Sequence, residues 1–162
     1  MNLREKIFSW EALPAWRKTL REQQKKLVVT NGCFDILHLG HVCYLEAARN
    51  EGDALLVAVN GDASVREIKG PGRPVNCETD RALVLAALAS VDGVYIFHER
   101  TALRLLSLLE PDIYAKGGDY TIDTINQEER RLIEQIGGKV VVLSAVPGKS
   151  TTALLGKISR WQ

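Results

Sequence analysis

Residues 30–41 read TNGCFDILHLGH and directly follow the apolar run Leu27-Val28-Val29. This order predicts a strand, a turn that contains Gly32, and the first turn of a helix that carries His38 and His41. The first N–H groups of a helix have no intrahelical partner and lie at the positive end of the helix dipole. A phosphate is therefore favoured at this place, and the two imidazoles would add donors to it.

The two histidines are three residues apart, so the sequence predicts that both lie on one face of the helix and point at one phosphate chain. Gly40 has no Cβ and would let a ligand approach closely. Such a site suits phosphoryl transfer, in which positioned donors meet the charge on the oxygens. A plain surface pair is the simpler reading. Zinc is disfavoured because only Cys33 and Asp35 lie nearby as further ligands.

Strand-like and helix-like segments alternate along the chain. Strands are predicted at 27–31, 54–60, 93–97, 112–116 and 139–143, and helices at 41–50, 77–90, 101–110 and 124–137. This alternation predicts an α/β fold: a Rossmann-like, parallel, five-stranded sheet of order 3-2-1-4-5 with helices on both faces. Ligands then bind at the carboxyl ends of the strands, where the strand order reverses.

Two parts of the chain differ in character. Residues 1–26 are polar and predict an N-terminal helical arm, with an apolar stripe suited to packing or to an oligomer contact. Residues 27–162 are predicted to form the catalytic domain. The stripe consists of Trp10, Leu13, Trp16 and Leu20.

Composition excludes several classes of function. The 162 residues are 46% hydrophobic, and 21 Lys and Arg against 20 Asp and Glu give a net charge of +1, so nothing favours a nucleic acid or a membrane as partner. The three cysteines, Cys33, Cys43 and Cys77, lack a CxxC spacing and come without a signal peptide. They predict reduced thiols and a cytoplasmic protein.

Further polar blocks fall where this fold would place a site. Asn60 and Asp62 follow the second strand, and the run 116–119, KGGD, follows the fourth. Its glycines suit either an ordinary turn or backbone amides that reach a nucleotide. Residues 69–74 read as a loop whose Lys69 and Arg73 are either solvated or cover an acceptor phosphate.

Two predicted helix starts carry further candidates. Arg81 opens the helix over 77–90 and is a candidate for the acceptor phosphate. The run Ser150-Thr151-Thr152 is predicted to begin a final helix. These residues could cap the helix and also bind a phosphate, and the two interpretations are compatible. His98 is read as a surface residue.

Taken together, these blocks resemble a known family. TNGCFDILHLGH is similar to the HxGH signature of the cytidylyltransferase-like nucleotidyltransferases, and the later blocks follow in the order seen in one branch of that family. That branch contains the heptose 1-phosphate adenylyltransferase domains of bifunctional heptose kinase/adenylyltransferases. The similarity extends from about residue 27 to residue 158. The blocks are residues 59–65, 69–75, 80–81, 116–120 and 150–152.

The resemblance implies an enzyme that transfers AMP from ATP to D-glycero-β-D-manno-heptose 1-phosphate. The products would be pyrophosphate and ADP-heptose, a precursor of the lipopolysaccharide inner core. Mg²⁺ would arrive with ATP, with no metal ligand assigned to the protein. It also implies a homo-oligomer, a dimer or higher, and a separate heptose kinase in the same pathway.

The resemblance also assigns roles to residues. His38 and His41 would be catalytic. The nucleotide would contact Asn31, Gly32, Cys33, Phe34, Asp35, Gly40, Lys116, Gly118, Asp119, Ser150, Thr151 and Thr152. The acceptor would contact Asn60, Asp62, Lys69, Arg73 and Arg81.

The last block departs from many relatives, which carry ISSTxxR. Leu155 stands where their arginine reaches the triphosphate, and Lys149 and Lys157 are candidates to replace that cation. Two alternatives stay open. One is a cytidylyltransferase acting on glycerol 3-phosphate or a related phosphorylated alcohol, since the HxGH scaffold serves both bases. The other is a non-catalytic nucleotide-binding regulatory module, which the presence of both histidines disfavours.

Overall fold

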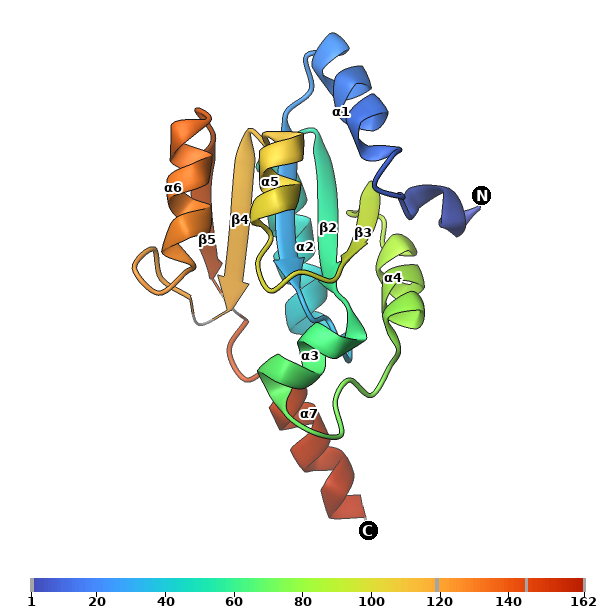
Figure 1. Cartoon of the computed structure of the whole chain (residues 1–162). Coiled ribbons are helices and arrows are strands. Elements are labelled where there is room, and N and C mark those ends of the chain that lie inside the picture. Colours follow the sequence, from blue (N-terminus) through green and yellow to red (C-terminus); the bar gives the residue numbers. More distant parts are fainter. Residues whose placement is uncertain (1, 119, 145, 162) are drawn as a thin grey trace.

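The computed structural model describes residues 2–118, 120–144 and 146–161, and its centre is a parallel sheet of five strands (Figure 1). The strand order is β3-β2-β1-β4-β5, which confirms the predicted order. Predicted and observed strands agree within two residues at every boundary. The strands are β1 (Leu27–Gly32), β2 (Ala54–Asn60), β3 (Gly93–Phe97), β4 (Ile113–Gly118) and β5 (Lys139–Ser144).

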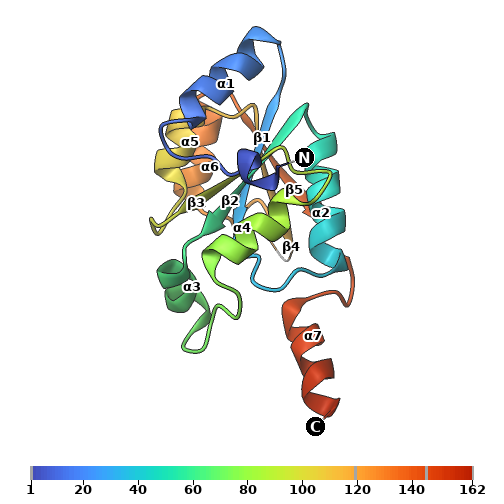
Figure 2. The same ribbon diagram turned by 90° about the vertical axis from the view of Figure 1, so that its right-hand side faces the viewer.

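Helices cover both faces of the sheet, as predicted. Figure 2 shows α1, α5 and α6 on one face and α2 on the other. Helix α4 packs into the same core as α2. Two further helices, α3 and α7, lie beyond the carboxyl ends of the strands (Figure 1). The α-helices are α1 (Leu13–Glu22), α2 (Leu39–Asn50), α3 (Asp62–Lys69), α4 (Glu78–Ala86), α5 (Leu103–Leu109), α6 (Gln127–Gln135) and α7 (Thr151–Ile158), with 3₁₀ turns η1 (Leu3–Lys6) and η2 (Ser159–Trp161).

Each face of the sheet has its own apolar core. All seven residues of β2 are buried, which is the pattern of a parallel strand covered on both sides. Alternation along β1 sends Leu27 and Val29 to the α5 face and Val28 to the α2 face. From the N-terminal segment, Leu13 and Leu20 are buried in the first of these cores. The apolar stripe of residues 1–26 therefore packs against this chain's own sheet.

Three elements differ from the sequence-based prediction. The segment Asp62–Lys69 forms α3, where no helix was expected, and α4 ends at Ala86 rather than near residue 90. Strand β4 continues to Gly118, so Gly117 and Gly118 lie within the strand and not in a turn after it. The extension follows from β5, which pairs with β4 as far as Gly118 opposite Ser144.

The sheet opens between its two central strands. Strands β1 and β4 are paired only at Val28 with Ile113 and at Val29 with Tyr114. Beyond this point the hydroxyl of Tyr44 spans the gap: it lies 2.6 Å from Thr30 Oγ1 and donates to the Ala115 carbonyl at 3.0 Å. The strand order reverses here, so the opening is the place where an α/β sheet binds its ligand.

None of the helices in the described part of the chain is both long and apolar enough to cross a membrane.

Candidate active site

The two histidines of residues 30–41 meet at the start of α2. His38 is the N-cap, with extended backbone (φ −142°, ψ 171°), and the helix begins at Leu39. The prediction that both histidines share one helical face is therefore wrong, because His38 lies outside the helix. The rings still come together: they stack with centroids 3.9 Å apart and planes inclined by 22°.

Burial keeps these imidazoles neutral. Desolvation lowers the pKa of His38, and desolvation together with the neighbouring His38 lowers the pKa of His41 to about 4. Within the described residues, the Nδ1 atoms of both rings are buried and have no hydrogen-bond partner. Because buried polar atoms are normally paired, these two nitrogens mark the histidine pair as a candidate ligand site.

Gly40 lets the C-terminal helix approach this pair. A Cβ at this position would lie 2.9 Å from the Lys149 carbonyl oxygen and 2.9 Å from His38 Nδ1. Helix α7 begins directly after Lys149, and its N-cap Ser150 accepts a hydrogen bond from the Ala153 N–H at 3.1 Å. The start of α2 has no side-chain cap. Two helix N-termini therefore converge, an arrangement that favours an anion.

Asp35 is used by the protein itself. Its buried carboxylate accepts hydrogen bonds from Arg73 Nε at 2.6 Å and from the N–H groups of Val75 and Asn76 at 2.8 and 3.1 Å. The Asp35 side chain thus anchors the loop between α3 and α4. The ion pair uses Arg73 Nε, which leaves the terminal Nη groups of Arg73 outside that pair.

Arg81 is buried and is held by partners within the protein. Its side chain is only 1% exposed and forms an ion pair with Asp62 at 2.7 Å. It also donates to the carbonyls of Cys33 at 2.6 Å and Asn76 at 3.0 Å. These contacts join the turn after β1 to α3 and α4, so the structure supports a structural role for Arg81.

Asn31 and Lys116 meet across the opening between β1 and β4. Lys116 Nζ donates to Asn31 Oδ1 at 2.7 Å and lies 5.2 Å from the centre of the Tyr120 ring. Burial lowers the pKa of Lys116, and the charge of Glu129 on α6 opposes that shift. The structure therefore brings together two blocks that are 85 residues apart.

Other predicted residues of the turn are largely enclosed. Phe34 is 7% exposed, adopts φ 45°, and places its ring edge-on to His41 with centroids 5.3 Å apart. Gly32 makes room for this ring, because a Cβ there would lie 2.9 Å from Phe34 Cε2. Burial raises the pKa of the Cys33 thiol, which keeps it protonated. Asn60 is buried and donates to Ser64 Oγ at 3.1 Å.

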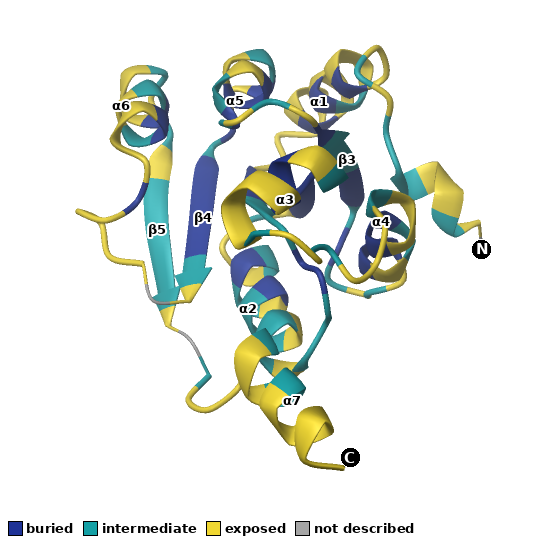
Figure 3. Ribbon diagram, turned by 60° about the horizontal axis from the view of Figure 1, so that its bottom comes forward, coloured by how far each residue is buried: buried dark blue, intermediate teal, exposed yellow. Residues whose placement is uncertain are grey.

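The remaining candidates lie at the rim of the carboxyl edge. Lys69 is exposed at the end of α3, and Gly118 adopts φ 87° at the end of β4. Thr151 and Thr152 form the first turn of α7, which stands out as largely exposed in Figure 3. Asp119 lies outside the described residues. Of the two candidate cations, both exposed, Lys149 adjoins Gly40, whereas Lys157 lies in the last turn of α7.

Two groups important to the site were missed from the sequence. Tyr44 fills the space that a side chain on Gly117 would occupy, since a Cβ there would lie 2.3 Å from the Tyr44 ring. Glu129 is 3% exposed although its segment, QEERRLIEQ, reads as a solvated helix. For Tyr44, the one sequence feature that indicated a close neighbour was the glycine pair Gly117-Gly118. For Glu129, no feature of the surrounding sequence indicated burial.

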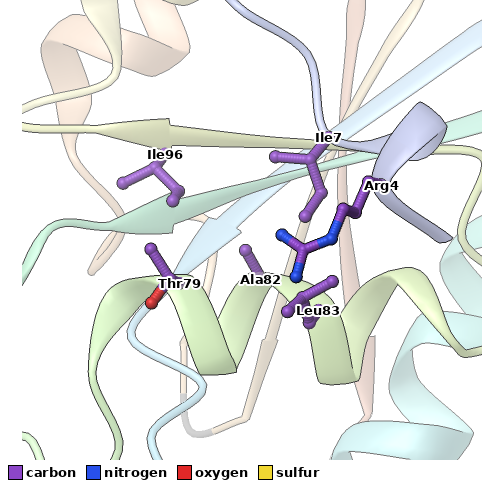
Figure 4. A pocket seen from close by; sticks show the side chains of 6 residues that line it. All are labelled: Arg4, Ile7, Thr79, Ala82, Leu83 and Ile96. Carbon is purple, nitrogen blue, oxygen red and sulfur yellow. The ribbon is translucent and has the colours of Figure 1, made fainter.

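A separate hollow lies on the flank of the molecule (Figure 4). Its volume is about 280 Å³, and it lies between η1, β3 and α4. The lining residues are Arg4, Ile7, Thr79, Ala82, Leu83 and Ile96, none of which is a predicted site residue. The candidate site is therefore the open carboxyl edge and not this hollow.

Comparisons with known proteins identify relatives of this chain. The bifunctional protein HldE of Mesorhizobium japonicum is 54% identical over 144 residues, which cover 89% of this chain and 28% of that protein. HldE of Geotalea uraniireducens is 50% identical, over 94% of this chain and 31% of that protein. The chain thus spans less than a third of the length of these curated relatives.

Solved structures show the same fold. The lipopolysaccharide core biosynthesis protein of Thermoplasma volcanium matches with a TM-score of 0.63 and 29% identity, over 75% of this chain and 97% of that one. The pantoate-beta-alanine ligase of Francisella tularensis, solved with ATP analogue and beta-alanine, matches in fold alone, with a TM-score of 0.58 and 15% identity over 90% and 68% of the two chains. The cytidylyltransferase-like family matches residues 29–154. The chain therefore belongs to the cytidylyltransferase-like family of nucleotidyltransferases.

Proposed function

We propose that this protein transfers AMP from ATP to D-glycero-β-D-manno-heptose 1-phosphate, giving ADP-heptose and pyrophosphate. The observation that carries the proposal is the His38–His41 stack at the meeting point of α2 and α7. Among the residues that the structure describes, nothing pairs with the buried Nδ1 atoms of these two rings. The HldE relatives and the match to a lipopolysaccharide core biosynthesis protein support the heptose acceptor.

In the proposed reaction an oxygen of the sugar phosphate attacks the α-phosphorus of ATP. The bond from that phosphorus to the α–β bridging oxygen breaks, and the electron pair leaves with pyrophosphate. The attacking oxygen is already anionic at neutral pH, so no strong base is needed. Positioning two anions and stabilising the leaving group set the barrier. His38 and His41 would donate hydrogen bonds to the triphosphate as charge develops on it.

The proposed nucleotide site runs along the carboxyl edge. Backbone groups of Gly32, Cys33, Phe34, Gly40 and Gly118, and side chains of Asn31, Lys116, Asp119, Ser150, Thr151 and Thr152, would contact ATP. Asp35 would contribute indirectly, by holding the loop that carries Arg73. Asn60, Lys69 and Arg73 are proposed for the acceptor. Asp62 and Arg81 would act by holding α3 and α4 in place.

Mg²⁺ is proposed to come with ATP. Among the residues the structure describes, no three His, Cys, Asp or Glu side chains gather in a way that could hold a metal ion. The oxygens of the triphosphate are the hard ligands that Mg²⁺ prefers. The ion would neutralise part of the charge on the triphosphate.

We also propose the setting in which the enzyme works. It would act in the cytoplasm as a homo-oligomer, and a heptose kinase of the same pathway would prepare its acceptor.

The test is to incubate the protein with Mg²⁺, heptose 1-phosphate and either ATP, CTP or GTP, and to measure pyrophosphate and the nucleotide sugar. ADP-heptose from ATP alone is the expected result. Pyrophosphate release with CTP and glycerol 3-phosphate, and none with heptose 1-phosphate, would move the assignment to a cytidylyltransferase. Release in none of the reactions, with ATP still bound, would contradict catalysis of either transfer and favour a binding module.

A further inference from the structure

A chain of buried polar groups links helix α6 to the candidate nucleotide site. Glu129 is 3% exposed, and its Oε1 accepts a hydrogen bond from the Ala102 N–H at 2.8 Å. Its Oε2 lies 2.7 Å from the hydroxyl of Tyr114, which is itself fully buried on β4. The same hydroxyl lies 2.7 Å from Asn31 Oδ1, the atom that accepts from Lys116 Nζ.

The hydroxyl of Tyr114 has one proton and two acceptors at equal distance. A carboxylate is the stronger acceptor, so the proton goes to Glu129 and a lone pair of the Tyr114 oxygen faces Lys116 Nζ, 3.4 Å away. Asn31 Oδ1 accepts from the same ammonium on its other side. Lys116 Nζ is thus held between the Tyr114 hydroxyl oxygen and Asn31 Oδ1. Glu129 sets the orientation of the Tyr114 hydroxyl by accepting its hydrogen bond.

We propose that Glu129, acting through Tyr114, is a positioning residue that holds the Lys116 ammonium and the Asn31 amide toward the nucleotide. The expected effect on catalysis rests on the proposed function. The effect of Glu129 on the pKa of Lys116 does not depend on that function. Within the described residues, the groups that face Lys116 are Asn31 on β1, Tyr114 on β4, Tyr120 after β4 and Glu129 on α6. Of these, Glu129 alone carries a formal negative charge at neutral pH.

Replacing Glu129 by Gln tests the chain of contacts. The amide oxygen of the new Gln can still accept from the Ala102 N–H. Its NH₂ group would donate to the Tyr114 oxygen, so the Tyr114 O–H would have to turn away from residue 129. The variant also loses the charge that opposes the lowering of the Lys116 pKa by burial. We expect E129Q to lose about tenfold in kcat/KM for ATP, in line with an interaction to a charged group of about 1.4 kcal/mol. In the pH–rate profile, the loss of activity on the basic side should occur at a lower pH in E129Q than in the wild type.

Tyr114→Phe is the milder second variant, because it removes the oxygen and keeps the ring. It should lower kcat/KM for ATP with little change in fold. Glu128→Gln is the matched control for charge, since Glu128 is exposed beside Glu129, and Tyr95→Phe is the control for loss of a hydroxyl. Both controls should behave as wild type.

The deciding readout is the titration of Lys116 followed by NMR of ¹⁵Nζ-labelled lysine, with the signal assigned by its loss in Lys116→Gln. This measurement needs no turnover, so it separates the present inference from the proposed function. A lower pKa of Lys116 in E129Q and not in E128Q is expected. An unchanged titration and an unchanged pH profile in E129Q and Y114F would overturn the inference, as would a loss of stability alone.

Discussion

At the scale of single residues, the site depends on side chains that the fold holds away from water. His38 and His41 were identifiable from the sequence because their spacing and the strand before them are local features. The role of Arg81 was not, since a sequence does not show that a guanidinium points inward at Asp62 and two carbonyls. The same holds for Asp35, whose partners are about 40 residues away.

Replacing His41 by Ala should remove a donor that acts on the reacting phosphates. We expect kcat to fall by about 10²–10³-fold, the usual cost of one preorganised donor, with a smaller change in the affinity for ATP. Steady-state kinetics and calorimetric titration with ATP measure the two quantities. His98→Ala is the control, because the His98 side chain is 67% exposed and lies on the surface. Near-wild-type turnover of the His41 variant would refute the assignment.

The low pKa of His41 also predicts a dependence of stability on pH. Its pKa is about 4 in the folded protein and 6.5 in an unfolded chain, so between these values the unfolded state binds more protons. The contribution of this residue is therefore absent above pH 6.5 and destabilises the fold increasingly as the pH falls toward 4. Urea unfolding at several pH values should show a shallower acid decline in His41→Asn. Parallel curves for the two proteins would contradict the lowered pKa.

Arg81 provides a test of a structural role against a binding role. Arg81→Met leaves Asp62 without its partner and two carbonyls without donors, so we expect a loss of about 2–4 kcal/mol in the free energy of unfolding. Urea titration measures this loss. Unchanged stability together with a raised KM for the sugar phosphate would restore the prediction that Arg81 binds the acceptor.

At the scale of elements, the strands were predictable because short apolar runs bounded by polar turns are distinctive. Helix α3 was not, since it is only eight residues long, and its arrangement depends on Glu78 accepting from the Asp62 N–H. The end of β4 was also missed. Two glycines normally end a strand, and here Tyr44 covers the first of them.

The contact of α2 with the start of α7 gives a prediction about Gly40. In Gly40→Ala the new methyl group would meet the Lys149 carbonyl and the His38 ring, so α7 or the ring must move. We expect kcat/KM for ATP to fall at least about tenfold, because a small misplacement of groups that position the reactants has a large effect on the rate. The circular dichroism spectrum should stay unchanged, since the fold is kept. Gly156→Ala is the control on α7 itself, since a Cβ there meets no atom within 4 Å. Equal activity of both variants would contradict the role given to this contact.

At the scale of the whole molecule, the arrangement follows from a strand order that reverses between β1 and β4. The alternation of strand-like and helix-like segments predicted a parallel sheet with helices on both faces. The Rossmann-like strand order assumed for it was confirmed, and with that order the edge of the sheet where a ligand is expected to bind. The packing around the site could not be predicted. It joins β1, β4 and α6 through Asn31, Lys116 and Glu129, which are brought together only when the sheet is complete.

The proposed reaction requires that the His38–His41 stack binds the triphosphate of ATP. NMR titration of ¹⁵N-histidine-labelled protein with ATP and, separately, with AMP tests it without reference to the acceptor. ATP should shift the His38 and His41 signals and raise the pKa of His41 from about 4, because the anion stabilises the protonated ring, whereas AMP should change them much less. Histidine signals that stay unchanged at saturating ATP would contradict the account.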